Sequence, residues 1–113
     1  MQKNSCDIII PVWNELDATA ECINSIVKHT HYPYRLVIID NASDAPTRDY
    51  LRSLRDRKEI NLELIRNERN LGFVKAVNQG IVLSDAPYLC IMNNDTVATA
   101  GWLEVMINAM ESH

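Results

Sequence analysis

The stretch YLCIMNNDT, residues 88–96, decides how this chain is interpreted, because an apolar run stops there at two amides and a carboxylate. A continuous apolar run is typical of a strand that is buried on both faces, so we expect a buried strand over residues 88–92. Its carboxyl end would carry Asn93, Asn94 and Asp95. In open α/β sheets ligands bind beyond the carboxyl ends of the strands. The polar triplet is therefore a candidate binding site.

Composition indicates an ordinary folded domain. The chain has 113 residues, enough for one domain with a single core. Apolar residues make up 47% and charged residues 23%, values that argue against disorder and against a fibrous repeat. The formal net charge of -4 gives no electrostatic reason to expect nucleic acid or an anionic membrane surface as a partner.

The cysteines and the lack of long apolar runs bear on the compartment. Cys6, Cys22 and Cys90 lie far apart, each in or beside an apolar segment. We interpret them as small buried hydrophobes in a reducing compartment rather than as a disulfide or metal site. No apolar run approaches the roughly 20 residues that a membrane span needs, and the N-terminus lacks the pattern of a signal peptide. The sequence thus predicts a cytoplasmic chain without a membrane segment.

Apolar runs alternate with segments of helical spacing along the chain. We expect strands over residues 6–12, 36–39, 62–65 and 88–92, and helices that begin near residues 15, 46, 73 and 101. This order predicts an α/β fold: a mostly parallel, Rossmann-like sheet of about four strands with helices on both faces.

Two local expectations concern the helices. Asn14 is expected to cap the first helix. Its buried stripe is expected to follow three and four residue steps, through Leu16, Ala20, Ile23 and Val27. In the third helix, Gly80 is interpreted as a position of close packing rather than of ligand contact.

Three of the predicted strands end in polar residues, over 11–15, 40–43 and 93–95. Each cluster has a local explanation, namely a helix cap, a turn and an Asx turn. Because the carboxyl ends of parallel strands meet at one edge of a sheet, their coincidence favours a shared cleft. Asp40 suits hydrogen bonding to a ribose hydroxyl or a base N–H. Asp95 suits Mg²⁺ or Mn²⁺, which take oxygen ligands from carboxylate, phosphate and water.

Four segments also resemble, in order, the motifs of the family 2 glycosyltransferases of the GT-A fold. They are IIIPVWNE (8–15), VIIDNASD (37–44), RNERNLGFVKAVNQGI (66–81) and YLCIMNNDTVATAGWL (88–103). The similarity covers nearly the whole chain and is to the sugar-nucleotide-binding half of the family. The third segment is particularly similar to bacterial enzymes that build polysaccharides and rhamnose-containing chains.

The resemblance implies a role for each matching residue. Those implied to bind the nucleotide sugar are Pro11, Val12, Trp13, Glu15, Asp40, Asn41, Ser43, Asn70, Lys75, Asn93 and Asn94. The triplet occupies the DxD position of the family, in which the middle residue contacts ribose and Asp95 would bind the divalent metal, Mg²⁺ or Mn²⁺. Asn93 stands where the family usually has an acid, so Asp95 is the only carboxylate of the triplet.

The implied reaction is transfer of a sugar from a nucleoside-diphosphate sugar to a saccharide or lipid-linked acceptor, with inversion and with assistance from the metal. In the family the catalytic base belongs to an acceptor-binding half, so residues 1–113 are expected to be a donor-binding domain without that base. A binding-only module would explain the same motifs. A Rossmann dinucleotide domain lacks support, because PVWNELDA follows the first strand in place of G-x-G-x-x-G. A response-regulator-like domain would need clustered acids at that position.

Overall fold

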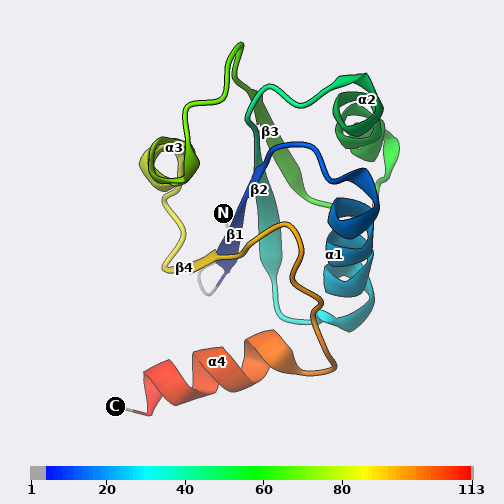
Figure 1. The fold of residues 1–113 in the computed structure, drawn as a ribbon. Helices are drawn as coiled ribbons and strands as arrows, with labels where there is room; N and C mark the ends of the chain where they lie inside the picture. The colour runs from blue at the N-terminus through cyan, green and yellow to red at the C-terminus, as the bar shows by residue number, and fades with distance from the viewer. Residues whose placement is uncertain (1–4, 113) are drawn as a thin grey trace.

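Four parallel strands form one sheet in the order β3-β2-β1-β4, with helices on both faces (Figure 1). The computed structural model describes residues 5–112. The strands are β1 (Cys6–Val12), β2 (Tyr34–Asp40), β3 (Leu62–Arg66) and β4 (Tyr88–Ile91). The helices are α1 (Leu16–His29), α2 (Ala45–Ser53), the short 3₁₀ helix η1 (Leu54–Asp56), α3 (Phe73–Leu83) and α4 (Trp102–Glu111). The predicted α/β fold is therefore confirmed.

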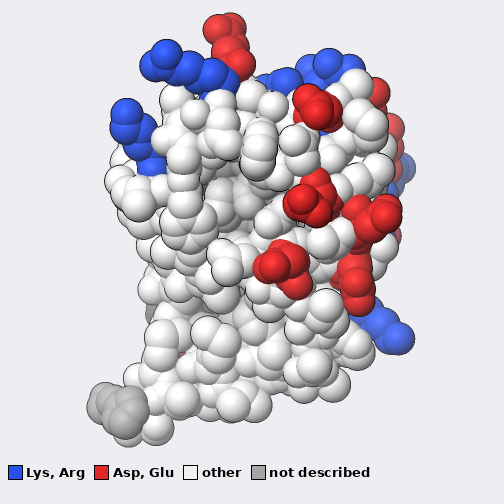
Figure 2. Space-filling view, in the orientation of Figure 1, with Lys and Arg blue, Asp and Glu red and all other residues white. Residues whose placement is uncertain are grey.

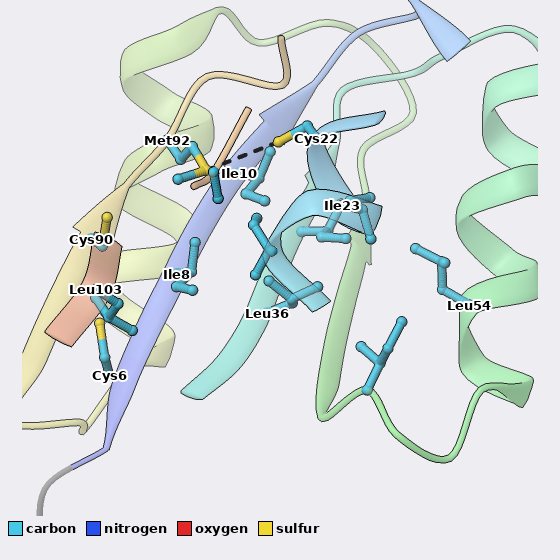
Figure 3. Packing of buried hydrophobic residues seen from close by; sticks show 14 of the residues in the cluster. Cys6, Ile8, Ile10, Cys22, Ile23, Leu36, Leu54, Cys90, Met92 and Leu103 are labelled. Atoms are coloured by element: carbon cyan, nitrogen blue, oxygen red, sulfur yellow. Dashed lines mark hydrogen bonds between the residues drawn. The ribbon is translucent and has the colours of Figure 1, made fainter. Parts of the chain in front are cut away.

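The two faces of the sheet bury alternate residues of the same strands. In β1, Ile8 and Ile10 face the larger core cluster, and Ile9 faces the smaller one. The larger cluster packs under α1, α2 and α4 (Figure 3), whereas α3 covers the opposite face. Because successive side chains of a strand point to opposite faces, an unbroken isoleucine run is what a doubly covered central strand requires.

The contact of α3 with the sheet is unusually close at Gly80. A Cβ placed on Gly80 would lie 2.7 Å from Cγ2 of Ile9, well inside van der Waals contact. This confirms the interpretation of Gly80 as a packing position, because only a residue without a side chain lets the helix approach β1 so closely.

The expectation that residues 88–92 form a strand buried on both faces is wrong. Within the described residues β4 pairs only with β1, so it is an edge strand. On one face Cys90 packs into the larger core, but on the other Leu89 is 43% exposed and Ile91 is 48% exposed. The reason is that α3 packs on β1 and β2 and leaves that face of β4 uncovered.

For α1 the expected cap is wrong, and the expected buried stripe is right only for Ile23 and, in part, Val27. The residue before the helix is Glu15, in the left-handed region with φ 63°, and no side chain caps the first turn. The buried positions of α1 are Thr19, Cys22, Ile23 and Ile26, so the buried face is rotated relative to the predicted stripe. Thr19 and Cys22 are buried because the chain that follows β4 crosses this face of α1 and offers polar partners to both. No helix of residues 5–112 has the length and apolar character to cross a membrane.

Candidate functional site

The strand order places a topological switch point between β1 and β4. The chain moves outward from β1 to β2 and β3, and then returns through α3 to the other side of β1. In open α/β sheets the crevice at such a point is the usual place for a ligand. A hollow of about 290 Å³ opens there. It is lined by Pro11, Val12, Trp13, Asn41, Asn70, Gly72, Phe73, Asn93 and Asn94.

This hollow brings together predicted residues from all three strand-end clusters. Trp13 is 57% exposed at its mouth, where it offers an aromatic surface to a ligand. Asn93 follows β4 with its side chain exposed. Gly72 and Phe73, where the loop after β3 meets α3, were not among the predicted site residues. They belong to the same sequence segment as Asn70, which is the signal that could have identified them.

Asn41 is buried and organises the loop that forms one wall of the hollow. Its Nδ2 donates to the carbonyl of Gly72 at 3.2 Å, and its Oδ1 accepts from the backbone N–H of Leu71 at 3.1 Å and from Nδ2 of Asn67 at 3.0 Å. Asn67 in turn exchanges hydrogen bonds with Gln79 of α3. One amide thus fixes the 67–72 loop to the end of β2.

Asp40 lies behind the hollow rather than in its lining. Its side chain is 2% exposed, with Oδ2 accepting from Nη1 of Arg66 at 2.7 Å and Oδ1 accepting from the backbone N–H of Ser43 at 2.9 Å. The same Nη1 donates to the carbonyl of Ser43 at 3.1 Å. Sequence reasoning missed Arg66, although the run of β3 also ends in polar residues, at Arg66 and Asn67.

Asn14 ties the loop after β1 to the loop after β2. Its backbone N–H donates to Oγ of Ser43 at 2.8 Å, and its Oδ1 accepts from the backbone N–H of Asp44 at 2.7 Å. These bonds require a left-handed backbone at Asn14, with φ 58°, a region that asparagine tolerates better than most residues. Instead of capping α1, Asn14 holds two walls of the site together.

The triplet after β4 presents its three side chains differently. Asn94 is half-buried and donates from Nδ2 to Oγ1 of Thr19 at 2.9 Å. Asp95 is exposed, and within the described residues its carboxylate accepts no hydrogen bond. The side chain of Asn93 is exposed. Its backbone carbonyl accepts from the backbone N–H of Thr96 at 3.1 Å, which closes the turn.

The donor set at the triplet fits a divalent metal only if the ligand supplies most of its coordination. Within residues 5–112 no group of three His, Cys, Asp or Glu side chains comes together. Mg²⁺ and Mn²⁺ are commonly held by one or two protein carboxylates together with phosphate and water. The exposed and unpaired carboxylate of Asp95 matches that requirement.

Besides Asp40, the predicted residues Ser43 and Asp95 lie outside the lining of the hollow, and so do Glu15 and Lys75. Glu15 is exposed at the start of α1 and does not line it. Lys75 points from α3 into a separate shallow surface with Asn78, Gln79 and Val82. Their predicted roles in nucleotide binding stay predictions.

Charge is distributed unevenly around the site. In Figure 2 acidic side chains gather over the α1 side of the visible face, and basic side chains lie along its upper rim. Arg66, at the end of β3, and Arg69, on the same loop as Asn70, line a second hollow together with Asn67, Glu68 and Leu71. Cationic side chains therefore lie next to the hollow at the switch point.

A different cavity, of about 430 Å³, lies at the amino ends of β1 and β2. Asp7 at its wall is buried, and its carboxylate accepts from Nη2 of Arg35 at 2.8 Å and from the hydroxyl of Ser84 at 2.5 Å. The hydrogen bond to Asp7 raises the pKa of the Arg35 guanidinium. This ion pair is satisfied within the fold, so Asp7 offers no unpaired charge to a ligand among the described residues of the cavity.

Comparison with known proteins identifies the family. The family model described as "Glycosyl transferase family 2" matches residues 7–113. The chain belongs to glycosyl transferase family 2.

Curated relatives agree with this assignment. The glycosyltransferase AglE of Haloferax volcanii is 31% identical over 100 residues, which cover 86% of the chain and 32% of AglE. An uncharacterized glycosyltransferase of Haemophilus influenzae is 24% identical over 106 residues, covering 94% of the chain and 32% of that protein. The chain therefore spans about a third of the length of these curated relatives.

The fold is shared with proteins whose structures are solved in complex with a nucleotide sugar. The crystal structure of S. aureus TarS 1-349 in complex with UDP-GlcNAc superposes with a TM-score of 0.84 at 20% identity, covering 96% of the chain and 32% of TarS 1-349. The mannosyltransferase PcManGT from Pyrobaculum calidifontis, in complex with GDP-Man and Mn²⁺, superposes with a TM-score of 0.79 at 22% identity, covering 93% of the chain and 31% of PcManGT. The architecture is thus the Rossmann-like GT-A part predicted from the sequence.

Proposed function

We propose that this chain is the donor-binding domain of a glycosyltransferase that transfers a sugar from a nucleoside-diphosphate sugar to an acceptor hydroxyl. The observation that carries the proposal is the hollow at the switch point, because most of the residues implied to bind the donor line it. The nucleotide-sugar complexes of TarS and PcManGT, which share the fold, support the same class of ligand.

The polar and aromatic groups of the hollow suit a nucleotide. The exposed ring of Trp13 offers a face for stacking against a base, a contact that every base can make. The side chain of Asn94 is available to a ribose hydroxyl. Arg69, on the adjacent loop, provides positive charge near a bound diphosphate. We assign Asp40 to the base side of the site, where its carboxylate also orients the Ser43 backbone.

Asp95 is the residue that would hold a divalent cation, Mg²⁺ or Mn²⁺. When bound, such a cation stabilises the negative charge that builds on the leaving diphosphate. Asp95 is suited to this task because it follows β4 with its side chain exposed and, within the described residues, unpaired. The neutral side chain of Asn93 leaves the triplet with one negative charge, so we expect metal affinity in the absence of a nucleotide to be low.

We place the catalytic base, and the acceptor site for a saccharide or lipid-linked acceptor, in a further part of a longer protein. The curated relatives AglE and the H. influenzae protein are about three times as long as the region that they share with this chain. The uncovered face of β4, with Leu89 and Ile91 exposed, supports packing of additional structure there. Inversion at the anomeric carbon belongs to this proposal. A cytoplasmic location does too, and the buried free thiols of the three cysteines support it.

Calorimetric titration of the chain with UDP and GDP, each with and without Mn²⁺, tests the proposal. We expect one of the two nucleotides to bind, and to bind more tightly with Mn²⁺. Asp95→Ala should remove most of the gain from Mn²⁺ while leaving stability unchanged, because the Asp95 side chain is exposed and makes no hydrogen bond within residues 5–112. Asp40→Ala should weaken binding as well, but that substitution also leaves Arg66 without its buried partner.

Asp56→Ala is the matched control, because Asp56 is also exposed and lies in η1, before β3 and away from the carboxyl edge. It should bind nucleotide as the wild type does. Equal Mn²⁺-dependent binding by the wild type and by Asp95→Ala would refute the metal site, and no binding of either nucleotide would refute the donor site. Sugar transfer by the full-length protein, given donor and acceptor, would exclude the alternative of a module that only binds.

A further inference from the structure

One face of α1 holds the segment that carries the triplet. Thr19, Cys22 and Ser25 are spaced three residues apart, which places them in a row along the helix. Each bonds to a different point of residues 93–98. Oγ1 of Thr19 accepts from Nδ2 of Asn94 at 2.9 Å, Sγ of Cys22 donates to the carbonyl of Asn93 at 3.7 Å, and Oγ of Ser25 accepts from the N–H of Ala98 at 2.8 Å.

The segment depends on these bonds because it has little regular structure of its own. Residues 92–101 contain no helix or strand. Beneath the triplet, the Cys22 thiol also lies 3.9 Å from the sulfur of Met92, and both side chains are buried (Figure 3). Burial raises the pKa of Cys22 to about 11, so the thiol keeps the proton that it donates. The row on α1 therefore sets where the triplet lies relative to β1.

The contact to Thr19 also determines which way the Asn94 amide faces. Thr19 is fully buried, and its hydroxyl donates to the carbonyl of Asn14 at 3.4 Å, so the oxygen of the hydroxyl is left to accept. Nδ2 of Asn94 donates to that oxygen and, at 3.5 Å, to the carbonyl of Asn14. Both partners are acceptors at this point, and only the NH₂ group can face them.

The oxygen of Asn94 is consequently left for a ligand. Within the described residues Oδ1 of Asn94 accepts no hydrogen bond, and Asn94 is part of the lining of the hollow at the switch point. A neutral carbonyl acceptor at this place matches the hydroxyl of a sugar, which is a hydrogen-bond donor. A phosphate, which offers only acceptors at neutral pH, does not match it.

We propose that Thr19 is a positioning residue of the donor site: it holds the Asn94 amide so that Oδ1 accepts a hydrogen bond from a ribose hydroxyl of the bound nucleotide. The inference rests on the proposed function, because it assigns an orientation within that site. Thr19 itself does not line the hollow and acts only through Asn94.

Thr19→Val tests the inference, because valine keeps the shape of threonine and removes the hydroxyl. We expect it to lower the affinity for the nucleotide about fivefold, the order expected for one lost hydrogen bond. The loss should be much smaller for the 2′-deoxy or the 3′-deoxy analogue of the same nucleotide. Binding of UDP and GDP and of their deoxy analogues, measured by calorimetry with Mn²⁺, gives both quantities. Thr19→Ser restores a hydroxyl and should restore the discrimination between ribose and deoxyribose.

Thr30→Val is the matched control. Thr30 is a buried threonine just after α1, and its Oγ1 accepts from Nε1 of Trp102 at 2.8 Å, so the substitution removes a bond of the same kind that anchors α4 instead of the triplet. It should lower stability about as much as Thr19→Val, with no change in nucleotide affinity. Equal loss of affinity in the two variants, or unchanged discrimination in Thr19→Val, would overturn the assignment.

Measurements on the ligand-free chain test this inference independently of the proposed function. NMR spectra without nucleotide should show the side-chain NH₂ signals of Asn94 displaced in Thr19→Val and unchanged in Thr30→Val. Unaltered Asn94 signals in Thr19→Val would refute the positioning role alone. Failure of the wild type to bind any of the nucleotides would refute the donor site, whatever the NMR spectra show.

Discussion

Replacing Gly80 by alanine has two opposing effects of similar size on the free energy of unfolding, and the structure decides which is larger. In an exposed helix interior the change from Gly to Ala stabilises by about 1 kcal/mol. At Gly80 the new Cβ would meet Cγ2 of Ile9 at 2.7 Å and both Cγ1 and Cδ1 at 3.1 Å, whereas carbon atoms pack best at about 3.5–4.0 Å.

Ile9 cannot move aside to make room. It is fully buried in the central strand and pairs with Val37 of β2 and Ile91 of β4. Both branches of its Cβ lie near the new methyl group, so rotation about χ1 exchanges one close contact for another. Overpacking of this kind costs about 1–3 kcal/mol, and the absence of a relaxed rotamer places the cost in the upper part of that range. We therefore expect Gly80→Ala to lower the free energy of unfolding by about 1–2 kcal/mol.

Urea unfolding followed by circular dichroism measures this difference. Asn78 provides the matched control, because it is exposed in the middle of the same helix and makes no hydrogen bond within the described residues. The difference between Asn78→Ala and Asn78→Gly gives the intrinsic helix preference of α3, which is then subtracted from the effect of Gly80→Ala. If Gly80→Ala is as stable as the wild type or more stable, helix propensity outweighs the contact with Ile9 and the reasoning is wrong.

Two further predictions concern the buried polar groups. Arg66→Met should lower the free energy of unfolding by about 1–3 kcal/mol, because it leaves the buried carboxylate of Asp40 without its cation. The partial exposure of Arg66 keeps the loss below the roughly 3–5 kcal/mol typical of a fully buried pair. Urea unfolding measures this loss. A loss below about 0.5 kcal/mol, the level of ordinary surface substitutions, would contradict this. Burial raises the pKa of the Cys22 thiol from 9.0 to about 11, so the folded chain holds this proton more tightly than the unfolded chain does. The contribution of Cys22 to stability is then complete below pH 9 and is lost as the pH rises toward 11, and thermal unfolding at several pH values should show a smaller alkaline loss in Cys22→Ala than in the wild type.

The sequence was sufficient for the order and type of the elements because those depend on local patterns. The isoleucine run of β1 and the apolar runs of the other strands mark the sheet, and the helical spacing between them requires crossovers. The sequence pattern gave a wrong prediction for β4, whose apolar run indicated a strand buried on both faces. The composition of a strand shows that its faces favour burial, but it does not show whether the described part of the chain supplies a cover for them.

The sequence predicted which residues gather at the candidate site better than it predicted their hydrogen-bond partners. Parallel strands bring their carboxyl ends to one edge, so the clustering of Trp13, Asn41 and Asn93 follows from the topology. The partners of the polar groups do not follow from it. Asn14 was expected to cap α1, yet it bridges to Ser43 and Asp44, which are distant in sequence.

The sequence by itself determined an α/β fold and a resemblance to one family, and it predicted the edge of the sheet that we propose as the nucleotide-sugar site, because strand and helix patterns and motif order are properties of neighbouring residues. Only the tertiary structure decided that Asp40 is buried against Arg66, that β4 is an edge strand, and that Thr19 aims the Asn94 amide. Each of these rests on a contact between segments far apart in the chain. Such contacts depend on how α1, the strand ends and the triplet segment pack together, and that packing is a property of the whole domain.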